Sequence, residues 1–526
     1  GETAAQIVEK AKAEGTGYKA SVEQMYYGNQ QFLFVYEQFD DVRLVAAPPS
    51  SIGKFGGDTD NWIWPRHTGD FSMFRVYASK DNRPAAYSPQ NVPYRPKKHF
   101  SISTKGVKEG DFTMIYGFPG NTQEYILSDA VAYIAERSDP AKIVVRTGRL
   151  DIITKAQESD PALRIHYAAK HASIANAWKK WQGEALGIDR RGTVAAKFDY
   201  ETQFGLWSVG RPEYAGVVMG LRAEYDRIMD AYFAYEITRE TLSTLPAAYT
   251  PEERAEECFA RRKFAEQALW RHAFREYGRC PKVYRTPSYA EGMARYKSPE
   301  AYADALFEAV WEGSDSVAMQ PAVRLREETK RMLDHISWML GTKSLRNLNS
   351  KILNELYTTY IKGLREWDRE RAFYPDANLT LRVAYGSVAG YEYADGEYHK
   401  PQTTLDGIIA KDNPEIYDYD IPQSLRDLYA SKNYGRWGTV IDGRRTVPVC
   451  FLATNHTTGG NSGSPVLNAG GELIGINFDR TWRSTMSDIA FDPAICRNIA
   501  VDIRYVLFVV DRVGGAGYLL KEMTLK

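Results

Sequence analysis

A serine in a glycine-lined turn is the feature of this sequence that most clearly carries chemistry. Residues 457–466 read TTGGNSGSPV, and they place Ser462 between Gly460 and Gly463. Glycines let the backbone fold tightly there, so the N–H groups of Gly460 and Ser462 can point at a developing oxyanion. The strand-like run ELIGINF follows at residues 472–478. The pattern indicates a serine nucleophile, with an ordinary turn between two strands as the alternative.

A serine nucleophile needs a general base, and the base needs a carboxylate that orients it. Asp70 opens an alternating, strand-like run after His67-Thr68-Gly69. An aspartate that leads into an apolar strand is where enzymes of the chymotrypsin type carry the orienting carboxylate. The competing interpretation of Asp70 is a turn cap at the edge of a strand.

The histidine of such a triad is the member that the sequence does not supply. His67 lies too close to Asp70, and His456, six residues before Ser462, is better placed to support the serine loop than to act as base. In the chymotrypsin order the base precedes Asp70 by a strand or more. We therefore expect the base to lie outside this chain as given. The chain begins Gly-Glu-Thr-Ala without a methionine, which is typical of a processed or incompletely covered protein.

Composition excludes several classes of function. Lys+Arg and Asp+Glu are equal at 67 each, so net charge gives no reason to expect a nucleic acid or an anionic membrane as partner. No segment approaches the roughly 18 apolar residues of a membrane span. The four cysteines match no zinc-binding spacing, and one or two disulfides remain open. We expect no metal and no cofactor.

The character of the chain changes twice along its length. Residues 24–130 are rich in aromatic and β-branched residues at strand-like spacing, and β character returns after residue 373. Between them the chain is rich in Ala, Glu, Lys, Arg and Leu at helical spacing. This order predicts a β domain over residues 1–130, an inserted α-helical domain over 131–372, and a second β domain with a C-terminal helix over 373–526.

Four long motifs resemble the serine dipeptidyl peptidases of the dipeptidyl-peptidase 7 and dipeptidyl-peptidase 11 type from Gram-negative bacteria. The motifs are FGGDTDNWIWPRHTGDFSMFRVYA, HYAAKHASIANAWKKWQGEALG, YPDANLTLRVAYG and TTGGNSGSPVLNAGGELIGINFDR. The resemblance covers nearly all of the chain. It implies a chymotrypsin-like double β-barrel with an inserted α-helical domain that covers the active-site cleft.

The resemblance also assigns roles to single residues. It places the nucleophile at Ser462 and the triad carboxylate at Asp70. The histidine of the family lies in an Asn-His-His-Cys run that does not occur here, so the first barrel is expected to be incomplete in this chain.

The family removes dipeptides from a free N-terminus, which requires acceptors for an ammonium group. By resemblance these acceptors are Asn61, Asn176 and Asp479, and Trp62 adjoins this subsite. Taken singly, each has an ordinary structural interpretation: a turn residue, a helix-surface amide, a strand-end cap and a core aromatic.

Arg480 follows Ser462 by 18 residues and ends the strand that walls the first specificity pocket in this fold. An arginine here resembles the dipeptidyl-peptidase 11 type, which prefers Asp or Glu before the cut. A guanidinium binds a carboxylate through a planar two-bond fork. A surface arginine is the alternative.

The resulting hypothesis is a serine exopeptidase that releases Xaa-Asp and Xaa-Glu dipeptides from peptides with a free N-terminus. A dipeptidyl peptidase with apolar preference, a catalytically silent peptide-binding relative, and an endoprotease of the same fold remain open. By resemblance we expect a homodimer in the periplasm or associated with the cell surface.

Overall fold

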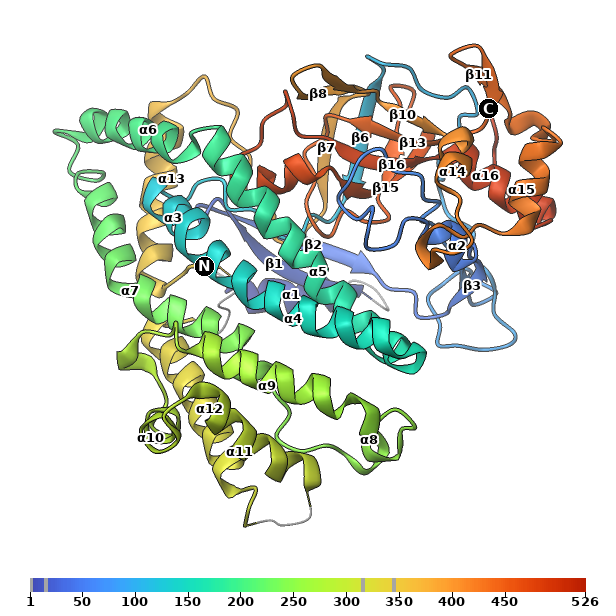
Figure 1. The fold of residues 1–526 in the computed structure, drawn as a ribbon. Coiled ribbons are helices and arrows are strands. Elements are labelled where there is room, and N and C mark those ends of the chain that lie inside the picture. Colours follow the sequence, from blue (N-terminus) through green and yellow to red (C-terminus); the bar gives the residue numbers. More distant parts are fainter. Residues whose placement is uncertain (1–2, 14–17, 314–316, 343–346) are drawn as a thin grey trace. The chain divides into compact units, whose positions relative to one another are not determined.

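The computed structural model describes residues 3–13, 18–313, 317–342 and 347–526, and the chain forms two compact units (Figure 1). One unit combines residues 1–125 with residues 374–526, and the other consists of residues 126–373. The helical unit is thus inserted in the sequence between two β segments. Its limits lie close to the range of 131–372 that the sequence predicted.

A seven-stranded antiparallel sheet is the centre of the β unit. Its strand order is β10-β13-β16-β15-β14-β6-β7. The strands are β6 (Phe112–Gly117), β7 (Arg382–Ser387), β10 (Gln402–Thr404), β13 (Pro448–Ala453), β14 (Pro465–Leu467), β15 (Leu473–Arg480) and β16 (Asn498–Asp502). Because β6 pairs with both β7 and β14, strands from both β segments share one sheet.

The central strands β13 and β16 are buried along their whole lengths. Their side chains alternate between two apolar clusters, one on each face of the sheet. Cys450 and its partner Val501 lie in one cluster with the helix α16 (Ile503–Phe508), whereas Phe451 and its partner Ala500 lie in the other. Burial on both faces explains the nearly continuous apolar run of β13.

Smaller sheets complete the β unit. They are the hairpin β1 (Tyr18–Met25) and β2 (Gln30–Glu37), the sheet β3 (Val42–Ala46), β4 (Met73–Ala78) and β5 (Val92–Pro93), and the pairs β8 (Tyr391–Ala394) with β9 (Glu397–His399) and β11 (Thr439–Ile441) with β12 (Arg444–Thr446). The helix α1 (Ala4–Ala13) precedes this hairpin, and pairing with β2 makes the mostly polar segment β1 a strand.

Helices also occur inside the C-terminal β segment. They are α14 (Leu405–Lys411), α15 (Gln423–Ala430), and α16 with its π-helical continuation η8 (Val509–Val513); the short helix α2 (Ser50–Gly53) belongs to the first segment. The predicted C-terminal helix is present and ends before Gly514 and Gly515, the second of which has φ of 61°. A 3₁₀ helix, η9 (Gly517–Glu522), follows.

The second unit is α-helical. Its longer elements are α3 (Ser128–Ala132), η1 (Tyr133–Ser138), α4 (Asp139–Ser159), α5 (Pro161–Arg190), α6 (Thr193–Ser208), α7 (Val217–Glu240), α8 (Pro251–Ala255), α9 (Lys263–Tyr277), α10 (Pro287–Tyr296), α11 (Pro299–Glu312), α12 (Gln320–Leu340) and α13 (Lys351–Trp367). Local sequence fixes several starts. Asp160 accepts a hydrogen bond from the amide of Ala162 at 2.8 Å, and Pro161 occupies the first helical position of α5.

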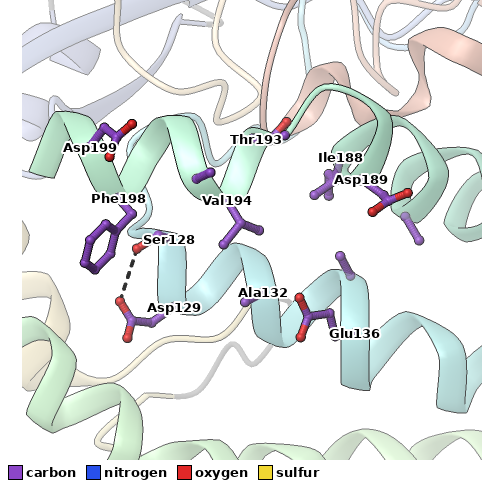
Figure 2. A pocket seen from close by; sticks show the side chains of 14 residues that line it. Ser128, Asp129, Ala132, Glu136, Ile188, Asp189, Thr193, Val194, Phe198 and Asp199 are labelled. Carbon is purple, nitrogen blue, oxygen red and sulfur yellow. Dashed lines mark hydrogen bonds between the residues drawn. The ribbon is translucent and has the colours of Figure 1, made fainter.

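A cavity of about 690 Å³ lies within the helical unit, between the segment α3–η1 and the helices α5 and α6 (Figure 2). Alanines, Ile188 and Val194 supply much of its apolar lining, and carboxylates lie around it. These carboxylates belong to Asp129, Glu136, Asp189 and Asp199.

Two expectations from composition can be compared with the structure. All four cysteines, which lie within the described residues, are free and buried. Burial raises the pKa of the Cys450 thiol to about 12, which keeps this sulfur protonated and unreactive. No helix in the described ranges is both long and apolar enough to cross a membrane.

Candidate active site

Ser462 lies on the turn between β13 and β14, and its side chain is exposed. Gly460 has φ of 104°, and a Cβ at this position would lie 2.4 Å from the carbonyl oxygen of Phe118. Glycine is therefore required here for both the backbone angle and the space. The Oγ of Ser462 donates a hydrogen bond to the carbonyl of Phe478 at 3.2 Å, which ties the serine to the end of β15.

Buried amides hold this turn in shape. The Asn461 side chain accepts from the amide of Thr458 at 3.1 Å, and Asn477 donates to the Asn461 carbonyl at 3.1 Å. Asn477 in turn accepts from Asn498 on β16 at 2.9 Å. The sequence analysis missed Asn461 and Asn477. Their only sequence signal is their place beside the serine and within the β15 strand.

The oxyanion hole at Gly460 and Ser462 stays a prediction, which concerns the backbone amides of this turn. Gly463 donates its amide to Asn477 and Ser464 donates its amide to Asn461. Within the described part of the chain, by contrast, the amides of Gly460 and Ser462 donate no hydrogen bond. These two N–H groups are therefore available to a ligand oxygen, as an oxyanion hole requires.

Asp70 lies just before β4, and the residue as a whole is exposed. Partial burial of its carboxyl raises the carboxyl pKa. The nearby Arg66 opposes this rise, and the nearby Asp479 adds to it. Asp70 therefore lies close to the charged end of β15. Its role as the triad carboxylate stays a prediction.

Asp479 is held by the loop that precedes Asp70. Its Oδ2 forms an ion pair with Nη1 of Arg66 at 2.7 Å, and each side chain is only 10% exposed. The same oxygen accepts the amide of Trp62 at 3.3 Å, and Oδ1 accepts the amide of Arg480 at 2.8 Å. Trp62 has φ of 67°, an uncommon angle for a side chain of this size. Arg66 was missed by the sequence analysis, although it lies only five residues after Asn61.

The loop that carries Asn61 and Trp62 is anchored at its start by Asp60. The carboxylate of Asp60 accepts from Nζ of Lys411 at 2.7 Å and from the hydroxyl of Tyr419 at 2.9 Å. Both partners come from the C-terminal segment of the β unit. The position of Trp62 is thus fixed from both sides, by Asp60 and by Asp479.

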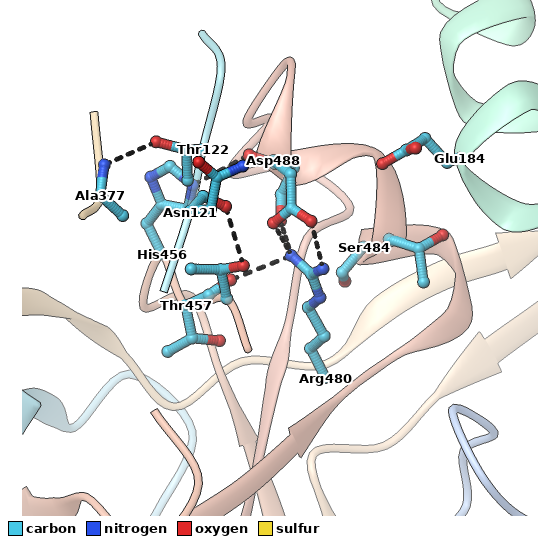
Figure 3. Close-up of polar contacts among 12 residues, drawn as sticks. Asn121, Thr122, Glu184, Ala377, His456, Thr457, Arg480, Ser484 and Asp488 are labelled. Carbon is cyan, nitrogen blue, oxygen red and sulfur yellow. Dashed lines mark hydrogen bonds and ion pairs between the residues drawn. The ribbon is translucent and has the colours of Figure 1, made fainter. Parts of the chain in front are cut away.

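Arg480 is buried, and its guanidinium faces Asp488 (Figure 3). Nη1 lies 2.6 Å from Oδ1 of Asp488, and Nη2 lies 2.8 Å from Oδ2. The guanidinium also lies 5.6 Å from the ring centroid of Trp62. The sequence identified Arg480 but gave no sign of this internal carboxylate.

An irregularity in β15 separates the two charged neighbours. Asn477 pairs with Ala500, but Asp479 pairs with Ile499, so one residue of β15 is extra. A bulge of this kind changes where the following side chains point. Asp479 accordingly contacts the loop around Arg66, whereas Arg480 contacts Asp488.

Asn176 is exposed on α5, in the helical unit. Its predicted part in the ammonium subsite therefore stays a prediction. The site residues that the structure brings together all lie in the β unit, where the serine turn, the strand end and the Trp62 loop converge. These residues are Ser462, Asp479, Arg480, Trp62 and Asp70.

Of the two histidines nearest in sequence to these residues, His67 and His456, the second is engaged by the segment that follows β15. His456 donates through Nε2 to the carbonyl of Ser487 at 3.0 Å and stacks on Phe491 at 4.3 Å between ring centroids. Burial lowers the pKa of His456 to about 4 and that of His67 to about 3. His456 thus supports the segment that carries Asp488.

A cluster of potential metal ligands lies in the helical unit. His166, Glu256 and Cys258 offer ligand atoms within 4.8 Å of one another. Nη1 of Arg262 lies 2.7 Å from Nε2 of His166 and 3.3 Å from Oε2 of Glu256. A guanidinium therefore supplies positive charge at this cluster, which has the character of an ion pair.

The chain matches the family model for peptidase S46 over residues 2–257 and 252–525. It belongs to the peptidase S46 family. Among curated relatives, the Asp/Glu-specific dipeptidyl-peptidase of Capnocytophaga gingivalis is 42% identical over 567 residues, covering 99% of this chain and 78% of the relative. The protein of the same name from Flavobacterium psychrophilum is 43% identical over 544 residues, covering 96% of this chain and 75% of the relative.

This S46 chain is also similar to relatives of a second name and to solved structures. Dipeptidyl-peptidase 7 of Phocaeicola vulgatus is 35% identical over 550 residues, covering 97% of this chain and 76% of the relative. The crystal structure of Porphyromonas endodontalis DPP11 matches with a TM-score of 0.87 at 34% identity, covering 99% of this chain and 80% of that chain. The same protein in complex with the dipeptide Arg-Glu matches with a TM-score of 0.84. The chain therefore has the mixed helix and sheet fold of DPP11.

Proposed function

We propose that this chain is a serine exopeptidase that releases dipeptides with Asp or Glu at the second residue. The observation that carries the proposal is the end of β15, where an acidic residue and an arginine follow each other beside an exposed serine. Two relatives of about equal identity are named Asp/Glu-specific dipeptidyl-peptidase, which supports the same activity.

The bond-breaking chemistry is acyl transfer. Ser462 Oγ attacks the carbonyl carbon of the second peptide bond, and its proton passes to a histidine oriented by Asp70. The N–H groups of Gly460 and Ser462 stabilise the oxyanion. The protonated histidine then gives the proton to the leaving amine. Water hydrolyses the acyl-enzyme and restores the serine.

The length of the product is set by recognition of the substrate ammonium group. Asp479 supplies a negative charge, and Asn61 and Asn176 supply amide oxygens. Trp62 forms a wall beside them. Support for this subsite comes from Asp479, whose ion pair with Arg66 holds the carboxylate next to Trp62.

Arg480 recognises the carboxylate of the second substrate residue. A guanidinium presents paired donors to a carboxylate, and burial strengthens the interaction. The buried position of Arg480 on the strand end behind Ser462 supports this role.

A dipeptidyl peptidase with apolar preference is the second candidate. The observation that favours it is the ion pair of Arg480 with Asp488, which neutralises the guanidinium. Relatives named dipeptidyl-peptidase 7 at about 35% identity are consistent with it. A peptide-binding relative without catalysis is a third reading, which any measured turnover would exclude.

The wider setting is part of the same proposal. We place the catalytic residues in a chymotrypsin-like double β-barrel, of which the β unit of this chain supplies a part. The active form is a homodimer in the periplasm. The resemblance of the four long motifs to the dipeptidyl peptidases supports these assignments, and size measurement and cell fractionation test them.

The decisive test uses one peptide in two forms, Leu-Asp-Ala-Phe-Lys with a free and with an acetylated N-terminus, and the protein in its active, full-length form. Mass spectrometry is expected to show Leu-Asp released from the free peptide only. Acetylation removes the positive charge that Asp479 and the amide oxygens would bind, and loss of this charged contact is expected to lower the rate by about 100-fold or more. Equal cleavage of both peptides would indicate an endoprotease.

A further inference from the structure

Arg480, which we assign to the acidic side chain of the substrate, already holds a carboxylate of this chain. Two parallel contacts of 2.6 and 2.8 Å join its Nη1 and Nη2 to the two oxygens of Asp488 (Figure 3). The side chains are 5% and 14% exposed. This two-point geometry is the one that a guanidinium also uses to bind a substrate carboxylate.

The guanidinium also has two neutral partners. Nη1 donates to the carbonyl of Thr457 at 3.1 Å and to Oγ of Ser487 at 2.8 Å. Asp488 therefore differs from Thr457 and Ser487 because it brings a full negative charge. It also lies only eight residues after Arg480, so one short segment carries both partners.

Because the Arg480–Asp488 pair is buried, the charge of Asp488 has a strong effect on the guanidinium. Electrostatic interactions are stronger away from water, and a buried cation without a counter-ion is unfavourable. A substrate carboxylate that approaches Arg480 meets a paired guanidinium, and it must share the guanidinium with Asp488 or displace it. A neutral substrate side chain leaves the pair intact.

We propose that Asp488 is a specificity-determining residue that acts through Arg480. It competes with the acidic side chain of the substrate for the guanidinium. By doing so it limits the preference for acidic over neutral side chains and keeps the pocket usable by neutral ones. The inference rests on the proposed function and adds to it a residue that sets the strength of the preference.

The test is the Asp488→Asn variant of the active protein, which keeps the shape of the side chain and removes its charge. Leu-Asp and Leu-Asn reporter amides have nearly the same shape and differ in charge, so the ratio of their kcat/KM values isolates the response to charge. Without the competitor, the Leu-Asp/Leu-Asn ratio is expected to rise about tenfold, the effect of redistributing one charged hydrogen bond. If the role of Asp488 were purely structural, both kcat/KM values would fall together and their ratio would stay unchanged. Either an unchanged ratio or a lower ratio would overturn the inference.

Two controls separate charge from position. Ser487→Ala removes a neutral partner from the same Nη1 atom, and its ratio is expected to stay within about twofold of the wild type, as for a neutral hydrogen bond. A tenfold rise in Ser487→Ala would mean that loosening Arg480, and not the charge of Asp488, changes the preference. If Asp488→Asn does not fold, Asp488→Ser removes the same charge with a smaller side chain, and the same ratio decides.

The Arg480→Gly variant separates a failure of the proposed function from a failure of the inference about Asp488. If Arg480→Gly leaves the Leu-Asp/Leu-Asn ratio unchanged, the assignment of Arg480 to the substrate acid fails. If Arg480→Gly abolishes the preference but Asp488→Asn leaves it unchanged, the function stands and only the competition by Asp488 is refuted.

Discussion

Asp479 and Arg480 are neighbours in the sequence, yet each belongs to a different ion pair. Asp479 pairs with Arg66, which lies 413 residues away in the loop before β4. Arg480 pairs with Asp488, only eight residues further along the chain. The bulge in β15 allows the two side chains to reach these different partners.

The difference shows how one strand end can serve two opposite charges. On the ammonium side, where Asp479 is assigned to the substrate ammonium group, the Arg66–Asp479 pair joins β15 to a loop that is distant in sequence. The position of the Asp479 carboxylate therefore depends on the whole fold of the β unit. On the carboxylate side, where Arg480 is assigned to the acidic side chain of the substrate, both members of the Arg480–Asp488 pair belong to one short segment. We expect changes on the ammonium side to affect all substrates, and changes on the carboxylate side to affect the choice among them.

The largest expected effect on turnover comes from removing the hydroxyl of Ser462, which acts on every substrate. Ser462→Ala is expected to lower kcat by on the order of 10⁶-fold, as for the nucleophile of another serine protease. The fold is expected to persist, because one exposed hydroxyl is lost. Turnover and thermal unfolding of the same purified sample check both. Substantial hydrolysis by the variant would place the nucleophile elsewhere.

Asp70 lies close to Arg66 and Asp479. Asp70→Asn in the active protein is expected to lower kcat by about 10⁴-fold, because the oriented histidine would take the wrong tautomer. The expected KM is nearly unchanged. A loss of tenfold or less, with normal folding, would show that Asp70 only caps a turn.

Asp479→Asn tests the ammonium side. Removing one partner of a buried charge pair is expected to lower kcat/KM by about 30-fold or more, and equally for acidic and apolar second residues. The matched control is Asp442→Asn, which breaks an exposed pair with Lys400 and is expected to change little. A loss confined to acidic substrates would contradict the separation of the two sides.

A further expected effect concerns the acid stability of the segment that carries Asp488. Burial lowers the pKa of His456 to about 4, so the unfolded chain binds more protons between pH 6.5 and 4. Stability is therefore lost as the pH falls through this window, by about 2–3 kcal/mol at most from this residue. His456→Gln, which can still donate to Ser487, is expected to remove that part of the loss. Urea unfolding at pH 6.5 and at pH 4 measures the free energy of unfolding of wild type and variant. The control is His335→Gln, because His335 is exposed. Equal pH dependence of wild type and His456→Gln would refute the assignment.

Local patterns predicted the parts of the fold that depend on local chemistry. The helical segment was readable from its spacing, and the serine turn from its glycines. The strand β1 was missed because its residues are mostly polar, whereas β2 lies in an aromatic run that was predicted as β; α14 and α15 were missed because each is short.

The candidate site was predicted where residue types are distinctive and missed where partners are remote. Ser462, Asp479 and Arg480 stand in one motif, so sequence alone could select them. Arg66 and Asp488 could not be assigned, because their roles follow from the loop path and from the bulge in β15. Charge partners of this kind are brought together only by the three-dimensional fold.

The most direct test of the central assignment compares Arg480→Gly with the wild type on Leu-Asp and Leu-Leu reporter amides. A buried charged hydrogen bond is worth roughly 1.5–3 kcal/mol, so kcat/KM for Leu-Asp is expected to fall about 10- to 150-fold. The value for Leu-Leu is expected to hold or rise, and the exposed Arg444→Gly serves as control. An unchanged Leu-Asp/Leu-Leu ratio in Arg480→Gly would show that Arg480 does not select acidic substrates and that the preference for Asp and Glu is wrongly assigned.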